Sequence, residues 1–466
     1  METAIKSAGL VILSVGLIVA GCVPKQPTEG WSLKNPEVVA QLKSFVAEKE
    51  AQADAVARAE GKTMLPEYKS LFAAAGRGDW LAVSNVFDDL RKRAPQYEHS
   101  GASDPRLRGP QWQALIETEG ALEQLANGDE KYEVAFGNDI IQSIPAGSIY
   151  FGGTDPGRFL VTALQKSQVD GDPFFTLTQN ALADETYLQY LRSMYKGKIY
   201  IPTDEDLQRC FADYVQDAQQ RLKEGKLKPG EDVRTDSDGR IQVSGEIAVM
   251  EINGLLVKII FDKNPNREFC VEESFPLDWM YSYLEPHGLI MKINRQPLAV
   301  LPPDVVQRDH DYWSKYVQPM IGGWLNDDTT VEDVAVFVEK IYLKHEFQGF
   351  TGDPQFVQNG YSCKTFSKLR SSLAGVYAWR VNHATSPADK ERMVREADFA
   401  FRQAWALCPY SPEAVYRYVN FLESQDRITD ALLIAETAAE FPSQPGFDTR
   451  QIETLITQLK RLQEPQ

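Results

Sequence analysis

The segment with the clearest chemical potential is a glycine-rich turn at residues 152–158, with the sequence GGTDPGR. It follows a short β-prone run and opens a helix, with Thr154 as the cap and Pro156 in the first turn. Free backbone N–H groups and the positive end of a helix bind anions, and Arg158 would clamp a phosphate or a carboxylate there. Asp155 would repel an anion, and neither the dinucleotide-binding nor the P-loop spacing is present. The alternative is a capped tight turn in which Arg158 covers apolar surface or pairs with an acid such as Asp155.

Two further polar residues are expected at the same place. Asn180 and Asp184 follow the next predicted strand, and ligands of open α/β sheets bind where the carboxyl ends of the strands meet. Their side chains would suit hydroxyl groups. The candidate ligand-binding residues are therefore Gly152, Gly153, Thr154, Asp155, Arg158, Asn180 and Asp184.

Other acidic and histidine residues give no complete site. Glu272 and Glu273 follow a predicted strand as a candidate acid/base pair, but neighbours on an extended chain point to opposite faces, so we expect a solvated edge pair. Residues 309–311 (Asp-His-Asp) have metal-ligand chemistry but lie on a predicted helix, where successive side chains diverge. The chain contains neither HExxH nor a Gly-x-Ser-x-Gly elbow. We therefore expect no metal and no cofactor, and the sequence identifies no reaction.

The first cysteine belongs to a different kind of motif. Residues 10–20 form an apolar run behind Lys6 that is too short to cross a bilayer comfortably as a permanent helix. Residues 19–22 (Val-Ala-Gly-Cys) then resemble the lipobox of bacterial lipoproteins, in which the cysteine thiol accepts diacylglycerol. The alternative is an ordinary signal or anchor helix with an incidental cysteine. In the sorting rule of such lipoproteins, an aspartate directly after the cysteine retains the protein at the inner membrane. Val23 occupies that position here, which favours the outer membrane.

This resemblance implies a signal peptide at 1–21, lipidation of Cys22 and a tether at 22–36, with an outer-membrane anchor facing the periplasm. Export would place the remaining cysteines in an oxidising compartment. They are Cys210, Cys270, Cys363 and Cys408. None forms a CxxC pair and three pairings are open, while buried free thiols are the interpretation we favour in a chain of this size.

Length and charge set broad limits. A chain of 466 residues with 43% apolar and 25% charged residues is typical of a soluble globular protein, and its length suggests roughly two to four domains. The net charge of -17 and the pI near 4.9 argue against a nucleic-acid partner, which needs a basic face.

Helical periodicity dominates residues 37–145. An apolar stripe at helical spacing opens this region with Val39, Leu42, Phe45 and Val46. Residues 66–95 predict a helical hairpin, and its small residues and closing proline make it similar to a tetratricopeptide unit. A second helical pair is predicted around 112–125 and 132–144.

Strand and helix patterns alternate over residues 146–300. Strands are predicted at 148–151, 173–178, 268–272 and 288–293, with a further β-prone run at 198–201. Helices are predicted from Thr154, from Asp184 and, with a capping box, from Thr203. Residues 247–261 fit a strand pair or a buried helix, and their length favours the helix. This alternation implies a mainly parallel sheet with helices on its faces.

The rest of the chain is predicted to be helical, with a connector at 301–360 and repeats at 361–466. A capping box at Thr330 opens one connector helix. Ala397, Phe401 and Ala404, closed by Pro409, recur 34 residues later as Ala431, Ala435 and Ala438. This is the spacing of tetratricopeptide repeats, and coincidental spacing of small residues is the alternative. The predicted fold is α/β with large all-α portions, in which tetratricopeptide-like hairpins flank a central sheet.

Two stretches resemble a known family. Residues 148–183 (SIYFGGTDPGRF and PFFTLTQNALAD) and 268–294 (EFCVEES and EPHGLIMKIN) are similar to the soluble part of glycosyltransferase-like bacterial membrane proteins related to protein O-mannosyltransferases. The resemblance extends over residues 130–445. In that family the lipid-linked sugar donor is used within a multi-span membrane domain, which this chain lacks. The resemblance therefore implies an envelope setting, with a glycan or peptide ligand at the Asp155 edge.

Together these patterns predict a lipid-anchored, non-enzymatic scaffold of the cell envelope, whose tetratricopeptide-like helices bind an envelope protein. The competing hypothesis is a glycan- or nucleotide-binding α/β region, or glycosyltransferase-like activity in it. Membrane contact is expected through the lipid on Cys22, and no nucleic-acid partner is expected.

Overall fold

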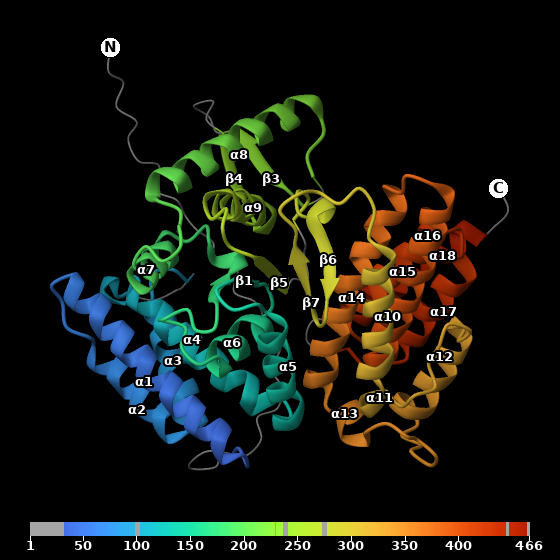
Figure 1. Ribbon diagram of the computed structural model, residues 1–466, viewed down its shortest axis with the longest axis horizontal. Helices are drawn as coiled ribbons and strands as arrows, with labels where there is room; N and C mark the ends of the chain where they lie inside the picture. Colours follow the sequence, from blue (N-terminus) through green and yellow to red (C-terminus); the bar gives the residue numbers. More distant parts are fainter. Residues whose placement is uncertain are drawn as a thin grey trace.

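A computed structural model describes residues 32–97, 103–228, 230–235, 241–272, 277–443 and 447–463. The predicted signal peptide, Cys22 and most of the tether lie outside the described residues, as does Glu273. A sheet lies at the centre, with the N-terminal helices on one side and the C-terminal helices on the other (Figure 1). None of the helices in the described ranges has both the length and the apolar character needed to cross a membrane. The predicted α/β fold with large helical portions is confirmed.

The N-terminal region is helical as predicted. Its elements are α1 (Pro36–Ala59), α2 (Pro66–Arg77), α3 (Trp80–Arg93), the short η1 (Pro105–Leu107), α4 (Gln111–Asn127) and α5 (Glu130–Ser143). The hairpin of α2 and α3 turns at Gly78, whose φ of 72° is a conformation that glycine adopts without steric cost. Asp79 then caps α3 by accepting a hydrogen bond from the N–H of Ala82.

Five strands form the main sheet. They are β1 (Ile149–Gly152), β2 (Phe175–Thr178), β5 (Phe269–Glu272), β6 (Leu284–His287) and β7 (Ile290–Ile293), in the spatial order β2-β1-β5-β7-β6. Strands β2, β1 and β5 are parallel neighbours, whereas β7 pairs antiparallel with both β5 and β6. Four strands therefore run in one direction, and an antiparallel hairpin extends the predicted parallel sheet.

The structure corrects the strand prediction in three places. Strand β6 was not predicted, because Pro286 breaks its pattern, yet proline is tolerated at the edge position that β6 occupies. A two-stranded sheet of β3 (Asp232–Thr235) and β4 (Ile241–Ser244) was also missed. Residues 198–201 form no strand, since the side chain of Asn264 bonds both backbone polar groups of Tyr200 in place of a neighbouring strand.

Helices cover both faces of the sheet. They are α6 (Asp155–Leu164), η2 (Gln179–Ala181), α7 (Glu185–Tyr195), α8 (Asp204–Glu224) and α9 (Glu246–Lys263), so the predicted helix at 247–261 is confirmed. The hydroxyl of Tyr150 in β1 donates to the carbonyl of Gly157 in α6, whereas the next residue, Phe151, stacks on Phe269, which contacts Phe261 of α9. Adjacent strand residues point to opposite faces, so α6 and α9 lie on opposite sides.

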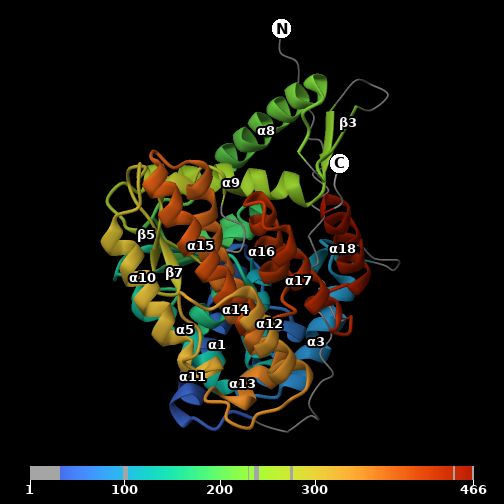
Figure 2. The same ribbon diagram turned by 90° about the vertical axis from the view of Figure 1, so that its right-hand side faces the viewer.

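The C-terminal part is helical throughout its described residues, apart from the short turns and loops between elements. After η3 (Tyr281–Tyr283) and the hairpin come α10 (Pro303–Tyr316), α11 (Gln318–Ile321), α12 (Val331–Val338), η4 (Glu339–Leu343), α13 (Pro354–Gln358), α14 (Gly360–Asn382), α15 (Pro387–Leu407), α16 (Pro412–Ser424), α17 (Ile428–Ala439) and α18 (Thr449–Gln463). Figure 2 shows α14 to α18 stacked on one side of the molecule. The repeat alanines Ala397, Ala404, Ala431, Ala435 and Ala438 are all fully buried.

One apolar core runs through all three regions. Helix α14 contacts α5 as well as β6 and β7, and α6 lies between the sheet and α4 with α5. The sheet is thereby held between two helical bodies, and each contributes side chains to the same core.

Candidate functional site

The glycine-rich turn after β1 is closed by a carboxylate from β5. Glu272, 1% exposed, accepts hydrogen bonds from the N–H of Gly153 (3.3 Å), the N–H of Thr154 (3.0 Å) and the hydroxyl of Thr154 (2.8 Å). Burial raises the pKa of Glu272, and the hydrogen bonds from Thr154 oppose this effect. The predicted solvated edge pair is therefore wrong for Glu272, because the turn supplies donors that hold its side chain inside.

Gly157 has a steric role in the same turn. A Cβ atom at this position would lie 1.9 Å from Oε2 of Glu272, so only glycine lets the carboxylate reach the turn. Thr154 caps α6 by accepting from the N–H of Gly157, as the sequence predicts. The anion-binding capacity of this turn is thus used by a side chain of the protein itself.

Arg158 is engaged within its own helix. Its guanidinium forms an ion pair with Asp155 (2.6 Å) and lies 4.2 Å from the ring centroid of Phe159. This matches the alternative weighed for the sequence, in which Arg158 pairs with Asp155. Gly152, on the opposite side of the turn, lies so close to Arg158 that a Cβ atom there would be 2.8 Å from the Cα of Arg158.

The two predicted polar residues after β2 separate in the structure. Asn180 reaches the turn, with its Nδ2 3.5 Å from the carbonyl of Gly153, and its Oδ1 has no hydrogen-bond partner within the described ranges. Asp184 instead caps α7 by accepting from the N–H and hydroxyl of Thr186. Gln179, which the sequence did not single out, is fully buried, and neither amide atom has a partner among described residues.

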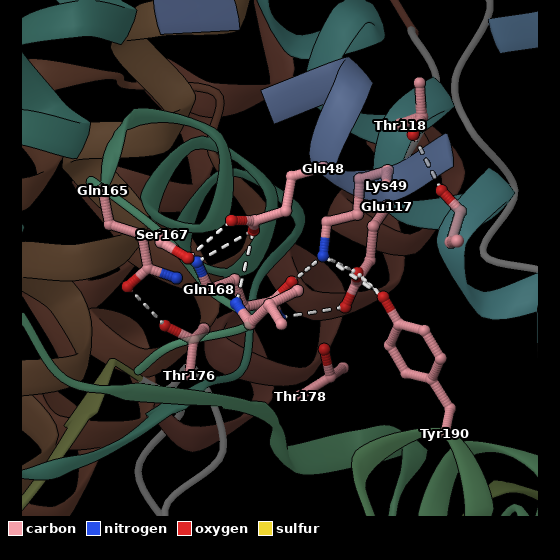
Figure 3. Close-up of polar contacts among 12 residues, drawn as sticks. Glu48, Lys49, Glu117, Thr118, Gln165, Ser167, Gln168, Thr176, Thr178 and Tyr190 are labelled. Atoms are coloured by element: carbon pink, nitrogen blue, oxygen red, sulfur yellow. Dashed lines mark hydrogen bonds and ion pairs between the residues drawn. The ribbon is translucent and has the colours of Figure 1, made fainter. Parts of the chain in front are cut away.

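A buried ionic cluster lies beside the loop that follows α6, and sequence reasoning missed it (Figure 3). Nζ of Lys49 on α1, fully buried, contacts Oε2 of Glu117 on α4 at 2.5 Å, Oη of Tyr190 on α7 at 3.2 Å and Oε1 of Gln168. Tyr190 and Gln168 also donate to Glu117. Burial and the nearby Glu117 raise the pKa of Tyr190 well above its ordinary value.

This cluster holds elements together and has no exposed face. Beside it, Glu48 accepts hydrogen bonds from Ser167 and from the N–H groups of Gln168 and Val169, which fixes the loop between α6 and β2 to α1 (Figure 3). A signal for Lys49 was present, because it continues the apolar stripe of Leu42, Phe45 and Val46 at helical spacing. A charged residue on such a stripe is buried only when it is paired.

Of residues 309–311, Asp309 and His310 make contacts inside the protein, whereas Asp311 is exposed. Asp309 forms a buried ion pair with Arg370 (2.8 Å) and accepts from the hydroxyl of Tyr377 (2.8 Å). His310 lies 3.2 Å from a carboxylate oxygen of Glu396, whose hydrogen bond raises the pKa of the imidazole. Among the described residues, no group of histidine, cysteine, aspartate and glutamate has the arrangement of a metal site.

An open groove lies between α14 and α16, and we call it the α14–α16 groove. Its volume is about 510 Å³. The lining residues are Tyr281, Ser372, Gly375, Ala378, Trp379, Asn382, Phe401, Arg417, Asn420, Phe421 and Ser424. Five of the lining residues are apolar or aromatic, namely Tyr281, Ala378, Trp379, Phe401 and Phe421. Arg417 is the one charged lining residue.

The residues that line the groove are held in place mainly by contacts with one another. Trp379 is stacked between Tyr281 (ring centroids 5.5 Å apart) and His383 (3.8 Å), and Phe421 packs on Phe401 (5.4 Å). Nη1 of Arg417 donates to the hydroxyl of Ser372 across the groove at 3.3 Å. These aromatic rings are therefore fixed before any ligand arrives.

Gly375 lies in the middle of α14 and opens the groove. A Cβ atom at this position would meet no atom within 4 Å. No neighbouring atom therefore requires a glycine here, although glycine inside a helix lowers stability relative to alanine. The missing side chain leaves room for an external group between the two helices.

Comparison of the chain with known protein families, with curated proteins and with solved structures finds no match.

Proposed function

We propose that this protein is a non-enzymatic, lipid-anchored adaptor of the bacterial envelope, which binds an extended segment of a partner protein in the α14–α16 groove. The observation that carries the proposal is the groove itself, with fixed aromatic walls, an open glycine and one cation. Small-molecule pockets are enclosed, whereas grooves between helices suit polypeptide segments.

The arrangement of the C-terminal helices supports a repeat surface. Helices α14 and α15 form one hairpin, α16 and α17 form the next, and α18 packs on α17 at the end. The groove lies between the first helices of the two hairpins, which is where stacked helical hairpins form a concave face. The buried alanines at 34-residue spacing permit the close contacts that such stacking needs.

The lining residues suggest the chemistry of the partner segment. Trp379, which is half-buried, offers apolar contact area, and the amides of the exposed Asn382 and Asn420 offer donors and acceptors for an extended backbone. Arg417 favours a carboxylate. We therefore propose a segment in which an apolar side chain stands next to an acidic one.

The polar edge of the sheet is a weaker candidate for the main function. The N–H groups expected to receive an anion are taken by Glu272, and Arg158 is paired with Asp155. A phosphate or glycan would have to displace both contacts, at the cost of leaving Glu272 buried without its donors. The contrast between an occupied turn and an open groove favours protein binding.

Photo-crosslinking in cells tests the proposal directly. A photoreactive amino acid at the exposed Asn420 should crosslink a discrete envelope protein, whereas the same group at the exposed Gln220 on α8 should not. A Cβ atom at Gly375 meets no atom within 4 Å, so Gly375→Phe should place a ring in the groove and abolish the crosslink, whereas the matched Gly375→Ala should retain it. The proposal is wrong if the crosslink is missing, or if it survives Gly375→Phe.

Labelled peptides test the chemistry of the segment. A fluorescein-labelled peptide with glutamate between leucine and tryptophan should bind, with affinity read from anisotropy. Arg417→Gln should weaken this peptide about tenfold or more and leave the matched glutamine peptide unchanged, since a charge-assisted contact contributes about 1.5–3 kcal/mol. Equal loss for both peptides would contradict the assignment of Arg417 to a carboxylate.

A further inference from the structure

Two of the buried cysteines touch each other. Sγ of Cys363, in the first turn of α14, lies 3.2 Å from Sγ of Cys408, which ends α15, and both residues are fully buried. The four cysteines of the described ranges are all free thiols, and Cys210 and Cys270 lie on α8 and β5. A disulfide bond is about 2.05 Å long, so a shift of roughly 1 Å would bring these two sulfur atoms to bonding distance.

We propose that Cys363 and Cys408 are a disulfide site, oxidised by a disulfide-bearing reagent such as glutathione disulfide or an exported thiol oxidase. The thiolate of one cysteine attacks a sulfur of glutathione disulfide and releases one glutathione thiolate, giving a mixed disulfide. The second cysteine then attacks the protein sulfur of that mixed disulfide and releases the second glutathione. The two protein thiols are oxidised, the reagent is reduced, and the two thiol protons pass to the two glutathione molecules.

The surroundings of the pair favour a thiolate at Cys363. Burial by itself raises the pKa of Cys363, but the hydrogen bonds it shares with Cys408 and Tyr410 and the charge of Lys364 bring it below the ordinary value. The hydroxyl of Tyr410 lies 3.3 Å from its sulfur. Burial and the hydrogen bond to Cys363 raise the pKa of Cys408. These contacts favour a thiolate on Cys363, and the exchange gives the same disulfide whichever cysteine attacks first.

The bond would join the start of α14 to the turn before α16, and later turns of these two helices line the groove. The cysteines are 45 residues apart, and Cys408 opens the short turn that leads into α16. A covalent link from this turn to the start of α14 would fix the spacing of the two helices that line the α14–α16 groove. Closing a loop of this length also restricts the unfolded chain, which stabilises the folded protein.

Peptide mapping of the full chain tests the site. The protein is refolded from urea, and in parallel incubated while folded, in a mixture of oxidised and reduced glutathione, then denatured, treated with iodoacetamide and digested with trypsin. Cleavage after Lys and Arg should yield residues 345–364 joined to residues 403–417, with Cys210 and Cys270 alkylated. Recovery of both peptides in alkylated or glutathione-bound form after either treatment would overturn the proposal, as would a link to Cys210 or Cys270.

Melting temperatures of matched cysteine variants test the same pair. The same oxidation should raise the melting temperature of the wild type by several degrees. Cys210→Ala should keep this rise, whereas Cys363→Ala and Cys408→Ala should lose it. A rise that persists in Cys363→Ala would show that another pair is oxidised. Because the mapping uses the wild-type chain, the result stands even if a variant fails to fold, and it is independent of whether the groove binds a partner.

Discussion

At the scale of single residues, Lys49 joins three helices and a loop through one buried ammonium group. Its contacts come from Glu117, Gln168 and Tyr190, which lie 68, 119 and 141 residues away in the chain. Breaking such a pair leaves a buried charge without compensation, which costs more than the pair itself contributes.

We expect Lys49→Met to lower the free energy of unfolding by about 3–5 kcal/mol, because Glu117 stays buried without its cation. Urea denaturation measures this change. The matched Lys43→Met, at an exposed position of the same helix, should stay within about 0.5 kcal/mol of the wild type. Adding Glu117→Gln to Lys49→Met should recover part of the loss. A small effect of Lys49→Met alone would contradict the structural role of this cluster.

Glu133 on α5 should make stability depend on pH. Burial raises its pKa to about 8, although the Ser362 hydroxyl donates to it at 2.7 Å. The folded state therefore retains a proton that the unfolded state releases near pH 4.5. The contribution of protonated Glu133 to the free energy of unfolding is fully present below pH 4.5. It is lost as the pH rises towards 8, at up to about 1.4 kcal/mol per pH unit.

Glu133→Gln removes the titrating group and keeps its shape. Its free energy of unfolding should fall less steeply than that of the wild type between pH 5 and 8, as read from urea melts at several pH values. The difference between the two curves isolates Glu133, because Glu119 and Glu123, with pKa values raised by burial to about 8 and 7, titrate in both proteins. Parallel curves would show that Glu133 titrates in its ordinary range.

At the scale of elements, side-chain caps mark the starts of many of the helices. Thr203 with Asp206 and Thr330 with Asp333 form complete capping boxes at the starts of α8 and α12. Both were predicted, because a capping box depends on residues three positions apart. The helix α9 was predicted from its length, and its burial on the sheet agrees with its apolar composition.

The packing of the C-terminal helices depends on small residues at their contacts. Ala404→Trp and Ala435→Trp should each lower the free energy of unfolding by about 1–3 kcal/mol or more, because both alanines are fully buried and the ring has no room. Ala388→Trp, at an exposed position in the first turn of α15, is the matched control and should change stability little. Tolerance of both buried changes in a thermal melt would show that these alanines are not at tight helix contacts.

At the scale of the whole molecule, the proposed anchor would hold the N-terminal end of the chain at the membrane. Lipidation requires a cysteine thiol, because serine cannot form the thioether. We expect Cys22→Ser to give an unlipidated precursor that takes up no radiolabelled palmitate in cells, whereas the wild type is labelled. Label in the serine variant would refute the lipobox interpretation.

The sequence alone determined the local features of this protein. The helices at 66–95, 112–144 and 387–463, the three parallel strands and the caps at Thr154 and Thr203 follow from residue types and short spacings. The pairing of Arg158 with Asp155 was also among the stated alternatives, since the two residues are three positions apart on one helix. Such features form over one or two turns of chain, so their signals are complete within a short window.

The tertiary structure decided everything that depends on distant partners. Glu272 occupies the turn because β5 is the neighbouring strand of β1. It lies 118 residues from Thr154 in the chain, so no local pattern encodes that contact. The contact of Cys363 with Cys408, the burial of Lys49 and the groove at Gly375 arise in the same way. The local sequence around a polar or small residue is the same whether its side chain faces water or another part of the protein. Only tertiary packing removes the water around it.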